Sequence, residues 1–378
     1  MTFTVKGRTM IKQNIIGPED GYRELKKWME PFKRILLVCG GSTKGLEVNS
    51  VLEDPKVVRF SDFKPNPDYY SIVKGVEIFK EKGCDAVMGV GGGSAIDVAK
   101  CIKLYATLPG DGMKGEWLKA ETGENGIPLF IMPTTAGTGS EATKFAVIYF
   151  EGVKQSVTDD SIIPGTVLMD PGALKSLPLY QRKCTMCDAL CHAIEAWWSV
   201  NSTEESRKYS REAVEAVMKY KDGYLSGTDE GNEGMLNAAF LAGKAINIAR
   251  TTAGHAMCYK ITSIFGLSHG HSVMLCNRVH YPWMMENLNR CTDPRGEEYL
   301  KGVLDDIGRA MGCRDGVDGS KKLVSLFEEM ELEVPVATES EIEEMKGGVN
   351  PLRMKNHPIR LDEETIERLY RKIVKTDR

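Results

Sequence analysis

The stretch "CDAVMGVGGGSAIDVAKCIKLYAT", residues 84–107, joins a β-strand pattern to a helical pattern through a run of glycines. The part before Gly91 is apolar and strand-sized, whereas the part after Ser94 repeats apolar residues at helical spacing. A strand that leads directly into a helix is typical of parallel sheets, because parallel strands need such crossover connections. This stretch therefore predicts an α/β fold.

The same alternation extends over the first half of the chain. Strand-like runs occupy residues 34–41, 128–133 and 166–170, and residues 69–83 form an amphipathic helical pattern that Gly83 closes. Beyond residue 175 the pattern changes, and no convincing strand follows. We therefore predict an α/β domain with a parallel sheet over residues 1–172 and an all-helical domain over residues 173–378. The long helical patterns cover residues 177–199, 206–225, 234–265, 298–312 and 361–374, and residues 344–360 read as a surface loop.

Composition excludes several classes of protein. The 378 residues, 42% hydrophobic and 27% charged, are typical of a globular protein with two cores. The net charge of −4 argues against a nucleic-acid partner, and no apolar run has the length of a membrane span. The N-terminus lacks the apolar core of a secretory signal. Ten cysteines, mostly in apolar runs, suit reduced thiols, so we expect a cytoplasmic protein; Cys184 and Cys187 have no second pair that would make a zinc motif.

Two loops contain candidates for dinucleotide binding. Residues 91–94 lie where a strand meets a helix N-terminus, which offers unpaired N–H groups to a pyrophosphate. A tight turn is the alternative, because this loop is neither the six-residue Rossmann fingerprint nor a P-loop. The second loop, "PTTAGTGSEAT" at residues 133–143, carries five hydroxyl side chains. Together the loops favour a dinucleotide site.

A possible metal site begins with Asp188 and His192, which are one helical turn apart and share a face. Their alternative role is a satisfied buried polar pair. His255 and His269 are fourteen residues apart, about 21 Å along an unbroken helix. However, Gly266 between them is a typical helix stop, so a chain reversal would bring the two together. One oxygen and three nitrogen ligands would then accept Fe²⁺ or Zn²⁺.

These motifs carry a resemblance to a known family. Through residues 91–100, 133–143 and 188–199 and the pair His255 and His269, the chain resembles the iron-containing (group III) alcohol dehydrogenases over nearly its whole length. The resemblance implies an N-terminal dinucleotide-binding domain, a C-terminal helical domain with a divalent metal, and a homodimer. It implies Asp188, His192, His255 and His269 as catalytic metal ligands. The implied cofactor contacts are Asn66, Gly92, Gly93, Ser94, Thr134, Thr135, Thr138, Thr143, Lys154 and Leu174.

One position departs from the family. Many members have another histidine four residues after the third ligand, in a proton relay, where this chain has Tyr259. Tyr259 is therefore a catalytic candidate; otherwise a water or the cofactor ribose delivers the proton, or the relay does not depend on this side chain. His271 does not replace that histidine by alignment, and we expect it to support the ligands from behind or to have a packing role.

The expected substrate is a short aldehyde. Residues 245–273 are most similar to the branch of phosphonoacetaldehyde reductases, which make 2-hydroxyethylphosphonate. The candidate substrate residues around His255 are Arg250, Thr251, Thr252 and Lys260. A cation with hydroxyls suits a phosphonate, although a solvated face or a domain-interface salt bridge explains the same residues. The alternative is a general short-chain alcohol dehydrogenase.

Cofactor choice depends on the end of the first strand. Family members restricted to NAD have an acid there, which repels a 2′-phosphate. In this chain the position aligns with Gly40, and Gly41, Ser42, Thr43 and Lys44 follow. We expect NADPH to be preferred or accepted, with NADH possible.

Two further alternatives differ in class. The related dehydroquinate synthases are lyases with the same architecture, but their metal sites use a glutamate and two histidines. A decayed, non-enzymatic relative is disfavoured because all four ligands are intact.

Overall fold

The computed structural model describes residues 12–123, 125–349 and 351–377; residues 1–11, which begin the stretch examined for a secretory signal, lie outside them. The chain forms two compact units. The first extends to Thr134 and includes Thr143–Asp170, and the second comprises Thr135–Ala142 and Pro171–Arg378. This division differs from the expected boundary mainly at residues 135–142, which belong to the helical unit. Gly139 explains the difference, because a Cβ there would lie 2.6 Å from the backbone of Gly243 on a helix of that unit.

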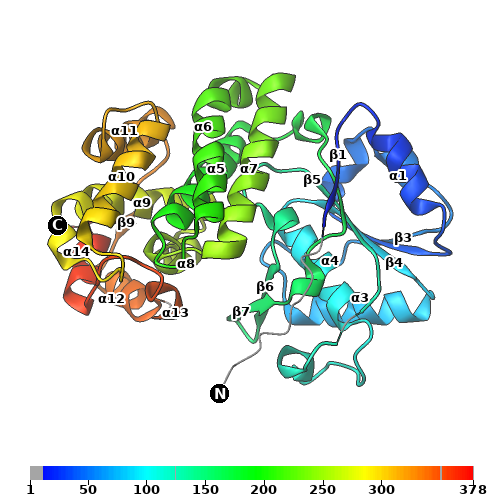
Figure 1. Ribbon diagram of the computed structural model, residues 1–378. Coiled ribbons are helices and arrows are strands. Elements are labelled where there is room, and N and C mark those ends of the chain that lie inside the picture. Colours follow the sequence, from blue (N-terminus) through cyan, green and yellow to red (C-terminus); the bar gives the residue numbers. More distant parts are fainter. Residues whose placement is uncertain (1–11, 124, 350, 378) are drawn as a thin grey trace, which may run out of the picture. The chain divides into compact units, whose positions relative to one another are not determined.

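The first unit is built on a parallel sheet. Its strands, in spatial order, are β1 (Asn14–Ile16), β8 (Thr166–Leu168), β5 (Leu129–Pro133), β4 (Ala86–Gly91), β2 (Ile35–Cys39) and β3 (Val57–Phe60). All neighbouring strands pair in parallel. The helices of this unit are α1 (Gly21–Met29), α2 (Asn49–Leu52), α3 (Tyr69–Glu81) and α4 (Gly93–Tyr105). The predicted α/β fold class is confirmed (Figure 1).

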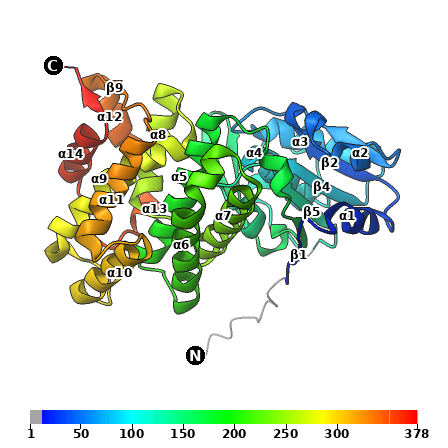
Figure 2. The same cartoon turned by 90° about the horizontal axis from the view of Figure 1, so that it is seen from above.

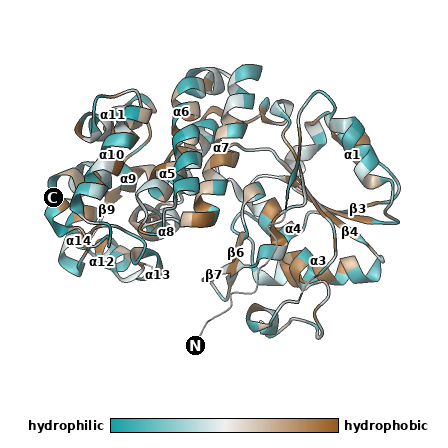
Figure 3. Ribbon diagram, in the orientation of Figure 1, coloured by the Kyte–Doolittle hydropathy of each residue, from teal (hydrophilic) through white to brown (hydrophobic). Residues whose placement is uncertain are grey.

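Glycine brings α4 close to the sheet. Strand β4 is buried along its whole length, and its hydrophobic colouring is visible in Figure 3. A Cβ on Gly89 would lie 2.7 Å from Ile131 on the next strand and 3.0 Å from Ala99 on α4. The absence of a side chain there therefore lets α4 pack directly against β4 and β5.

A hairpin that the sequence patterns did not predict follows η3 (Ser140–Ala142). Strands β6 (Phe145–Phe150) and β7 (Val153–Thr158) pair in antiparallel register around Glu151 and Gly152. Both turn residues have positive φ, +49° and +75°, which matches the twist of a two-residue hairpin. Ala146 and Ile148 of β6 point into the core of the first unit.

The second unit is helical. Its helices are α5 (Leu179–Trp198), α6 (Glu204–Ser226), α7 (Asp229–Ala249), α8 (Ala253–Phe265), α9 (His269–Glu286), α10 (Glu297–Ala310), α11 (Gly316–Glu329), α12 (Glu339–Gly347), α13 (Pro351–Met354) and α14 (Glu363–Ile373). Two short strands, β9 (Val336–Ala337) and β10 (Lys375–Thr376), also pair. Helix α5 contacts α6, α7 and α9, and Figures 1 and 2 show α5 beside α6 and α7. Among the described residues, no helix is long and apolar enough to cross a bilayer.

The prediction of one continuous helix over residues 234–265 is wrong. Helix α7 ends at Ala249, Arg250 has a φ of +62°, and α8 begins at Ala253. The break has a physical cause, because the N–H of Thr252 donates to the buried carboxylate of Glu195 on α5. Gly266, with a φ of +65°, then ends α8 where a helix stop was expected.

The surface loop expected over residues 344–360 is also wrong in part. Helices α12 and α13 occupy residues 344–347 and 351–354 of it, and His357 is only 3% exposed. The imidazole of His357 lies 6.0 Å from that of the fully buried His280 on α9. Neither ring has a hydrogen-bond partner among the described residues. Burial lowers the pKa of His280 to about 4 and that of His357 to about 3, although Glu195 partly opposes both shifts.

These two imidazoles should make the fold sensitive to mild acid. In the unfolded chain they bind protons near pH 6.5, whereas in the fold they stay neutral to about pH 4 and about pH 3. The unfolded state therefore binds more protons below pH 6.5, and stability is lost as the pH falls from there. We expect each imidazole to contribute a loss on the order of 1–2 kcal/mol between pH 7 and pH 5. Denaturant unfolding should show a shallower acid loss in His280→Leu than in the wild type at equal metal loading; identical slopes would contradict this.

Candidate metal centre

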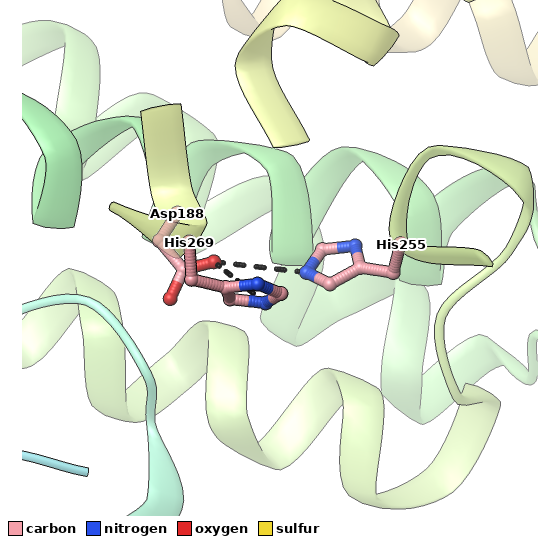
Figure 4. A group of neighbouring side chains, drawn as sticks. All are labelled: Asp188, His255 and His269. Carbon is pink, nitrogen blue, oxygen red and sulfur yellow. Dashed lines mark ion pairs between the residues drawn. The ribbon is translucent and has the colours of Figure 1, made fainter. Parts of the chain in front are cut away.

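Helices α5, α8 and α9 bring the four predicted metal ligands together. Oδ1 of Asp188 lies 3.6 Å from Nε2 of His255, 3.9 Å from Nε2 of His269 and 3.9 Å from Nε2 of His192. Figure 4 shows the carboxylate of Asp188 facing the imidazoles of His255 and His269. The ring of His192 stacks on that of His255, with centroids 4.4 Å apart. One carboxylate oxygen thus faces three imidazole nitrogens.

The donor set fits a divalent metal ion. Oδ1 of Asp188 and Nε2 of His255 are buried, and neither has a hydrogen-bond partner in the described part of the chain. Their separation is too long for a hydrogen bond, but ligand atoms that share one ion at about 2.0–2.2 Å lie roughly 3–4 Å apart. Burial lowers the pKa of His192 to about 4. Burial opposes ionisation of Asp188, yet the three imidazoles outweigh it and hold its pKa below the usual range. Neutral imidazole and ionised carboxylate are the forms that bind metals.

A glycine beside each of the two distant ligands permits the close helix packing. A Cβ on Gly270, which follows His269, would lie 2.0 Å from the carbonyl oxygen of Cys184 and 2.8 Å from Cβ of Asp188. A Cβ on Gly254, which precedes His255, would lie 2.4 Å from Oε1 of Glu195. Any larger residue would therefore push α8 or α9 away from α5. The absence of side chains at Gly254 and Gly270 therefore lets the neighbouring His255 and His269 lie close to α5.

Glu195 is a site residue that the motifs did not reveal. Its Oε1 lies 2.6 Å from Nδ1 of His255 and also accepts from Nδ2 of Asn277 at 2.8 Å. Its Oε2 accepts from both the N–H and the hydroxyl of Thr252, at 2.6 and 2.8 Å. Burial opposes ionisation, but these contacts hold the pKa of Glu195 below its usual range. Nδ1 of His255 donates to the carboxylate, which leaves Nε2 to face Asp188; such pairs orient metal-binding histidines. The available signal was spacing, since Glu195 follows His192 by three residues on the same helix.

Tyr259 lies beside the fourth ligand. Its ring is nearly parallel to that of His269, at 9°, with centroids 5.8 Å apart. The side chain of His269 is 38% exposed, whereas that of His255 is only 2% exposed. The cluster is therefore most open at the ligand that Tyr259 flanks. His271 bonds instead to the hydroxyl of Tyr180 and the carbonyl of Glu333, which matches its expected packing role.

Thr252 and Lys260 do not lie where the substrate hypothesis needed them. The hydroxyl of Thr252 is fully buried and bonds to Nε1 of Trp198 and to Glu195. Nζ of Lys260 forms an ion pair with Glu344 at 2.8 Å. Thr252 therefore bonds to the carboxylate of Glu195, and Lys260 is in an ion pair within the helical unit rather than at a domain interface.

The other two substrate candidates flank the helix break. Arg250 is the C-cap of α7. The hydroxyl of Thr251 accepts a hydrogen bond from Nη1 of Arg353 at 2.7 Å, and its carbonyl accepts one from Asn356. An arginine from α13, which the motifs did not reveal, thus reaches the segment beside His255.

The predicted cofactor residues of the first unit lie at strand ends. Gly92 is the N-cap of α4, and Gly91 has a φ of +158°, where a Cβ would lie 2.6 Å from Cβ of Ala95. The N–H of Asn66 donates to Oγ of Ser94 at 3.3 Å. The remaining candidates of this unit are Gly40, Gly41 and Ser42 after β2, Gly93 at the start of α4, Thr134 after β5, Thr143 before β6 and Lys154 on β7. The second unit contains Thr135, Thr138 and Leu174. These cofactor assignments stay predictions.

The buried side chain of Lys100 contacts Thr143, one of the predicted cofactor residues. Nζ of Lys100 donates to the carbonyl of Thr143 at 2.7 Å and lies 3.1 Å from its hydroxyl.

The ten cysteines are all free thiols, and Cys184 and Cys187 are buried on α5.

Comparison with known proteins agrees with this geometry. Residues 13–171 match the family model "Iron-containing alcohol dehydrogenase", and residues 183–374 match its C-terminal counterpart, "Fe-containing alcohol dehydrogenase family, C-terminal". Alcohol dehydrogenase 4 of Schizosaccharomyces pombe is 33% identical over 297 residues, which are 76% of this chain and 68% of the relative.

Solved structures share the fold. Sulfoacetaldehyde reductase from Bifidobacterium kashiwanohense, in complex with NAD⁺, has a TM-score of 0.86 at 23% identity and covers 99% of this chain and 100% of its own. An iron-containing alcohol dehydrogenase from Thermococcus thioreducens has a TM-score of 0.84 at 22% identity, over 96% of this chain and 98% of its own. With four metal-type ligands in one cluster and both halves matched, the chain belongs to the iron-containing alcohol dehydrogenase family.

Proposed function

We propose that this oxidoreductase reduces a short aldehyde with an anionic group on the neighbouring carbon, and that phosphonoacetaldehyde is its foremost substrate. The family makes the protein an alcohol dehydrogenase that uses a metal ion and NAD(H). The observation that carries the reaction is the cluster of Asp188, His192, His255 and His269. Support for the substrate comes from the resemblance of residues 245–273 to the phosphonoacetaldehyde reductases. A similar solved structure is that of a sulfoacetaldehyde reductase.

When bound, Fe²⁺ or Zn²⁺ polarises the carbonyl oxygen as a Lewis acid and the nicotinamide supplies hydride. The side chains of this protein supply charge, orientation and a proton. Asp188 contributes the negative charge of the cluster, and Glu195 fixes the tautomer of His255. We assign the proton that the product oxygen needs to the phenol of Tyr259, and support for this comes from its ring lying beside that of His269.

One observation favours the alternative of a general short-chain alcohol dehydrogenase. Glu344 neutralises Lys260, and Thr252 is committed to Glu195. Two of the four residues expected to recognise a phosphonate are therefore occupied. The lyase alternative has no such support, because the family is that of alcohol dehydrogenases.

The metal centre can be tested through the residue behind it. Glu195→Gln keeps the shape of the side chain but removes the charge that orients His255, so the metal affinity should fall about 10–100-fold with the fold intact. His269→Ala should lose the metal and most of the turnover. His271→Gln, on the same helix, should retain both. Metal affinity is measured by chelator competition, with circular dichroism as the control for folding. A Glu195→Gln variant that binds metal as tightly as the wild type would refute the positioning role.

Cofactor choice can be tested at the end of β2. Gly40 has no side chain to repel a 2′-phosphate, and the exposed Arg59 of β3 contacts Cys39 there, with Nη1 3.6 Å from Sγ. We therefore propose that NADPH is preferred or at least accepted. Gly40→Asp should shift the ratio of kcat/KM toward NADH about tenfold or more, and Arg59→Gln should lower kcat/KM only with NADPH. A wild-type enzyme that favours NADH tenfold would overturn the proposal.

The substrate proposal predicts a large preference between two aldehydes of similar reach. A dianionic phosphonate forms charge-assisted hydrogen bonds of about 1.5–3 kcal/mol each, which a methyl group cannot form. Phosphonoacetaldehyde should therefore exceed propanal in kcat/KM by roughly 100-fold. The measurement is NAD(P)H oxidation with both aldehydes at several concentrations. Equal efficiency would assign the enzyme to the general short-chain alcohol dehydrogenases.

A further inference from the structure

We propose that Cys258 is a positioning residue of the metal centre: its sulfur accepts the Nδ1–H of His269 and so directs Nε2 of that imidazole toward the metal ion. This role rests on the proposed function, because it requires the four predicted ligands to bind the metal. The sequence motifs gave no indication of Cys258.

The other two imidazoles of the cluster show the arrangement that His269 would share. Nε2 of every imidazole in the cluster faces Oδ1 of Asp188. Nδ1 of His255 lies 2.6 Å from Oε1 of Glu195, and Nδ1 of His192 lies 3.4 Å from the carbonyl oxygen of Gly137. Partners at the second nitrogen fix the tautomer and the ring orientation of metal-binding histidines. A third partner is therefore expected at Nδ1 of the remaining imidazole.

Sγ of Cys258 lies at that position. Its distance from Nδ1 of His269 is 3.7 Å, a hydrogen-bonding distance for the large sulfur atom. The S–H of Cys258 donates to the carbonyl oxygen of His255 at 3.5 Å. Because the thiol proton points to that carbonyl, sulfur faces the imidazole as an acceptor and Nδ1–H is the donor. Nε2 of His269 then carries no proton, which is the form that binds a metal ion.

The place of Cys258 in the fold suits this role. His255 and Cys258 are three residues apart on α8 and share a face, so α8 supplies one ligand and the partner of another. Cys258 is fully buried, whereas the side chain of His269 on α9 is 38% exposed. The most exposed ligand is thus held from its buried side. A neutral thiol accepts more weakly than a carboxylate, so His269 should be held less firmly than His255.

Two substitutions that differ by one hydroxyl group test the hydrogen bond. Cys258→Ala removes the acceptor, and the Kd for Zn²⁺ should rise about 10-fold, the lower end of the range for such partners. Cys258→Ser restores an acceptor and should keep the Kd within about threefold of the wild type. Cys258→Val fills the space of the thiol without an acceptor, so it should match Cys258→Ala and replaces it if the alanine variant does not fold. Chelator competition measures each Kd.

A Co²⁺-loaded protein gives a second readout that a loss of packing alone would not change. Co²⁺ accepts the same nitrogen and oxygen ligands, and its visible absorption depends on their number and geometry. At full occupancy, Cys258→Ala should change the position and intensity of this absorption. Cys258→Ser should reproduce the spectrum of the wild type.

Cys276→Ala is the matched control. It also removes a fully buried thiol, from the helix that carries His269. Its Tm should fall about as much as that of Cys258→Ala, while its Kd for Zn²⁺ and its Co²⁺ spectrum should stay those of the wild type. Circular dichroism confirms the fold of every variant.

The outcomes separate this role from the proposed function. If His269→Ala kept the metal ion, the ligand assignment behind the proposed function would fail, and the role of Cys258 with it. If His269→Ala loses the metal but Cys258→Ala keeps the wild-type Kd and spectrum, the role of Cys258 is wrong while the metal centre stands. Equal weakening in Cys258→Ser or Cys276→Ala would show an effect of packing and would overturn the hydrogen bond.

Discussion

The packing of α8 and α9 against α5 depends on two buried carboxylates on one face of α5. Glu195 and Asp188 are almost completely buried, and an ionised carboxylate without partners costs several kcal/mol in such a place. Glu195 is satisfied entirely by the protein, through His255, Thr252 and Asn277. Oδ1 of Asp188 has no hydrogen-bond partner among the described residues and faces only imidazole nitrogens. The protein thus satisfies the carboxylate of Glu195 with its own donors, whereas the carboxylate of Asp188 needs a bound cation.

The satisfaction of Glu195 shapes the chain around it. Because Oε2 accepts from the N–H of Thr252, the chain must leave the helical path between α7 and α8, and Arg250 takes up a positive φ there. The break orients α8 so that the imidazole of His255 lies near the carboxylates of both Asp188 and Glu195. Gly254 then permits the close approach to Oε1 of Glu195. The helix break and the position of the predicted metal ligand His255 are therefore consequences of one buried charge.

Sequence predicted the features that depend on local pattern. The strand, glycine loop and helix of residues 84–107 are contiguous, and the spacing of Asp188 and His192 follows from helical geometry alone. Gly266 indicated the reversal that brings His255 and His269 together. The fold class and the proximity of Asp188, His192, His255 and His269 could therefore be expected from the sequence.

The missed features depend on partners far away in the chain. The partner of Lys260, Glu344, is 84 residues away, and Arg353 is 102 residues from Thr251. Nothing in the local pattern of either segment indicates these pairs. Glu195 was missed for a related reason, since its role depends on groups that α8 and α9 supply, and on α5 alone it resembles any helical glutamate. Long-range pairing of polar side chains has no periodic signal.

The cluster is most exposed at His269. The side chains of Asp188 and His255 are 4% and 2% exposed, whereas that of His269 is 38% exposed. Tyr259 stacks on that same imidazole, and Arg353 lies over Tyr259. The enclosed side of the cluster is occupied by Glu195 and its hydrogen bonds. The exposed side of the cluster can therefore vary in sequence without disturbing the buried charges around His255.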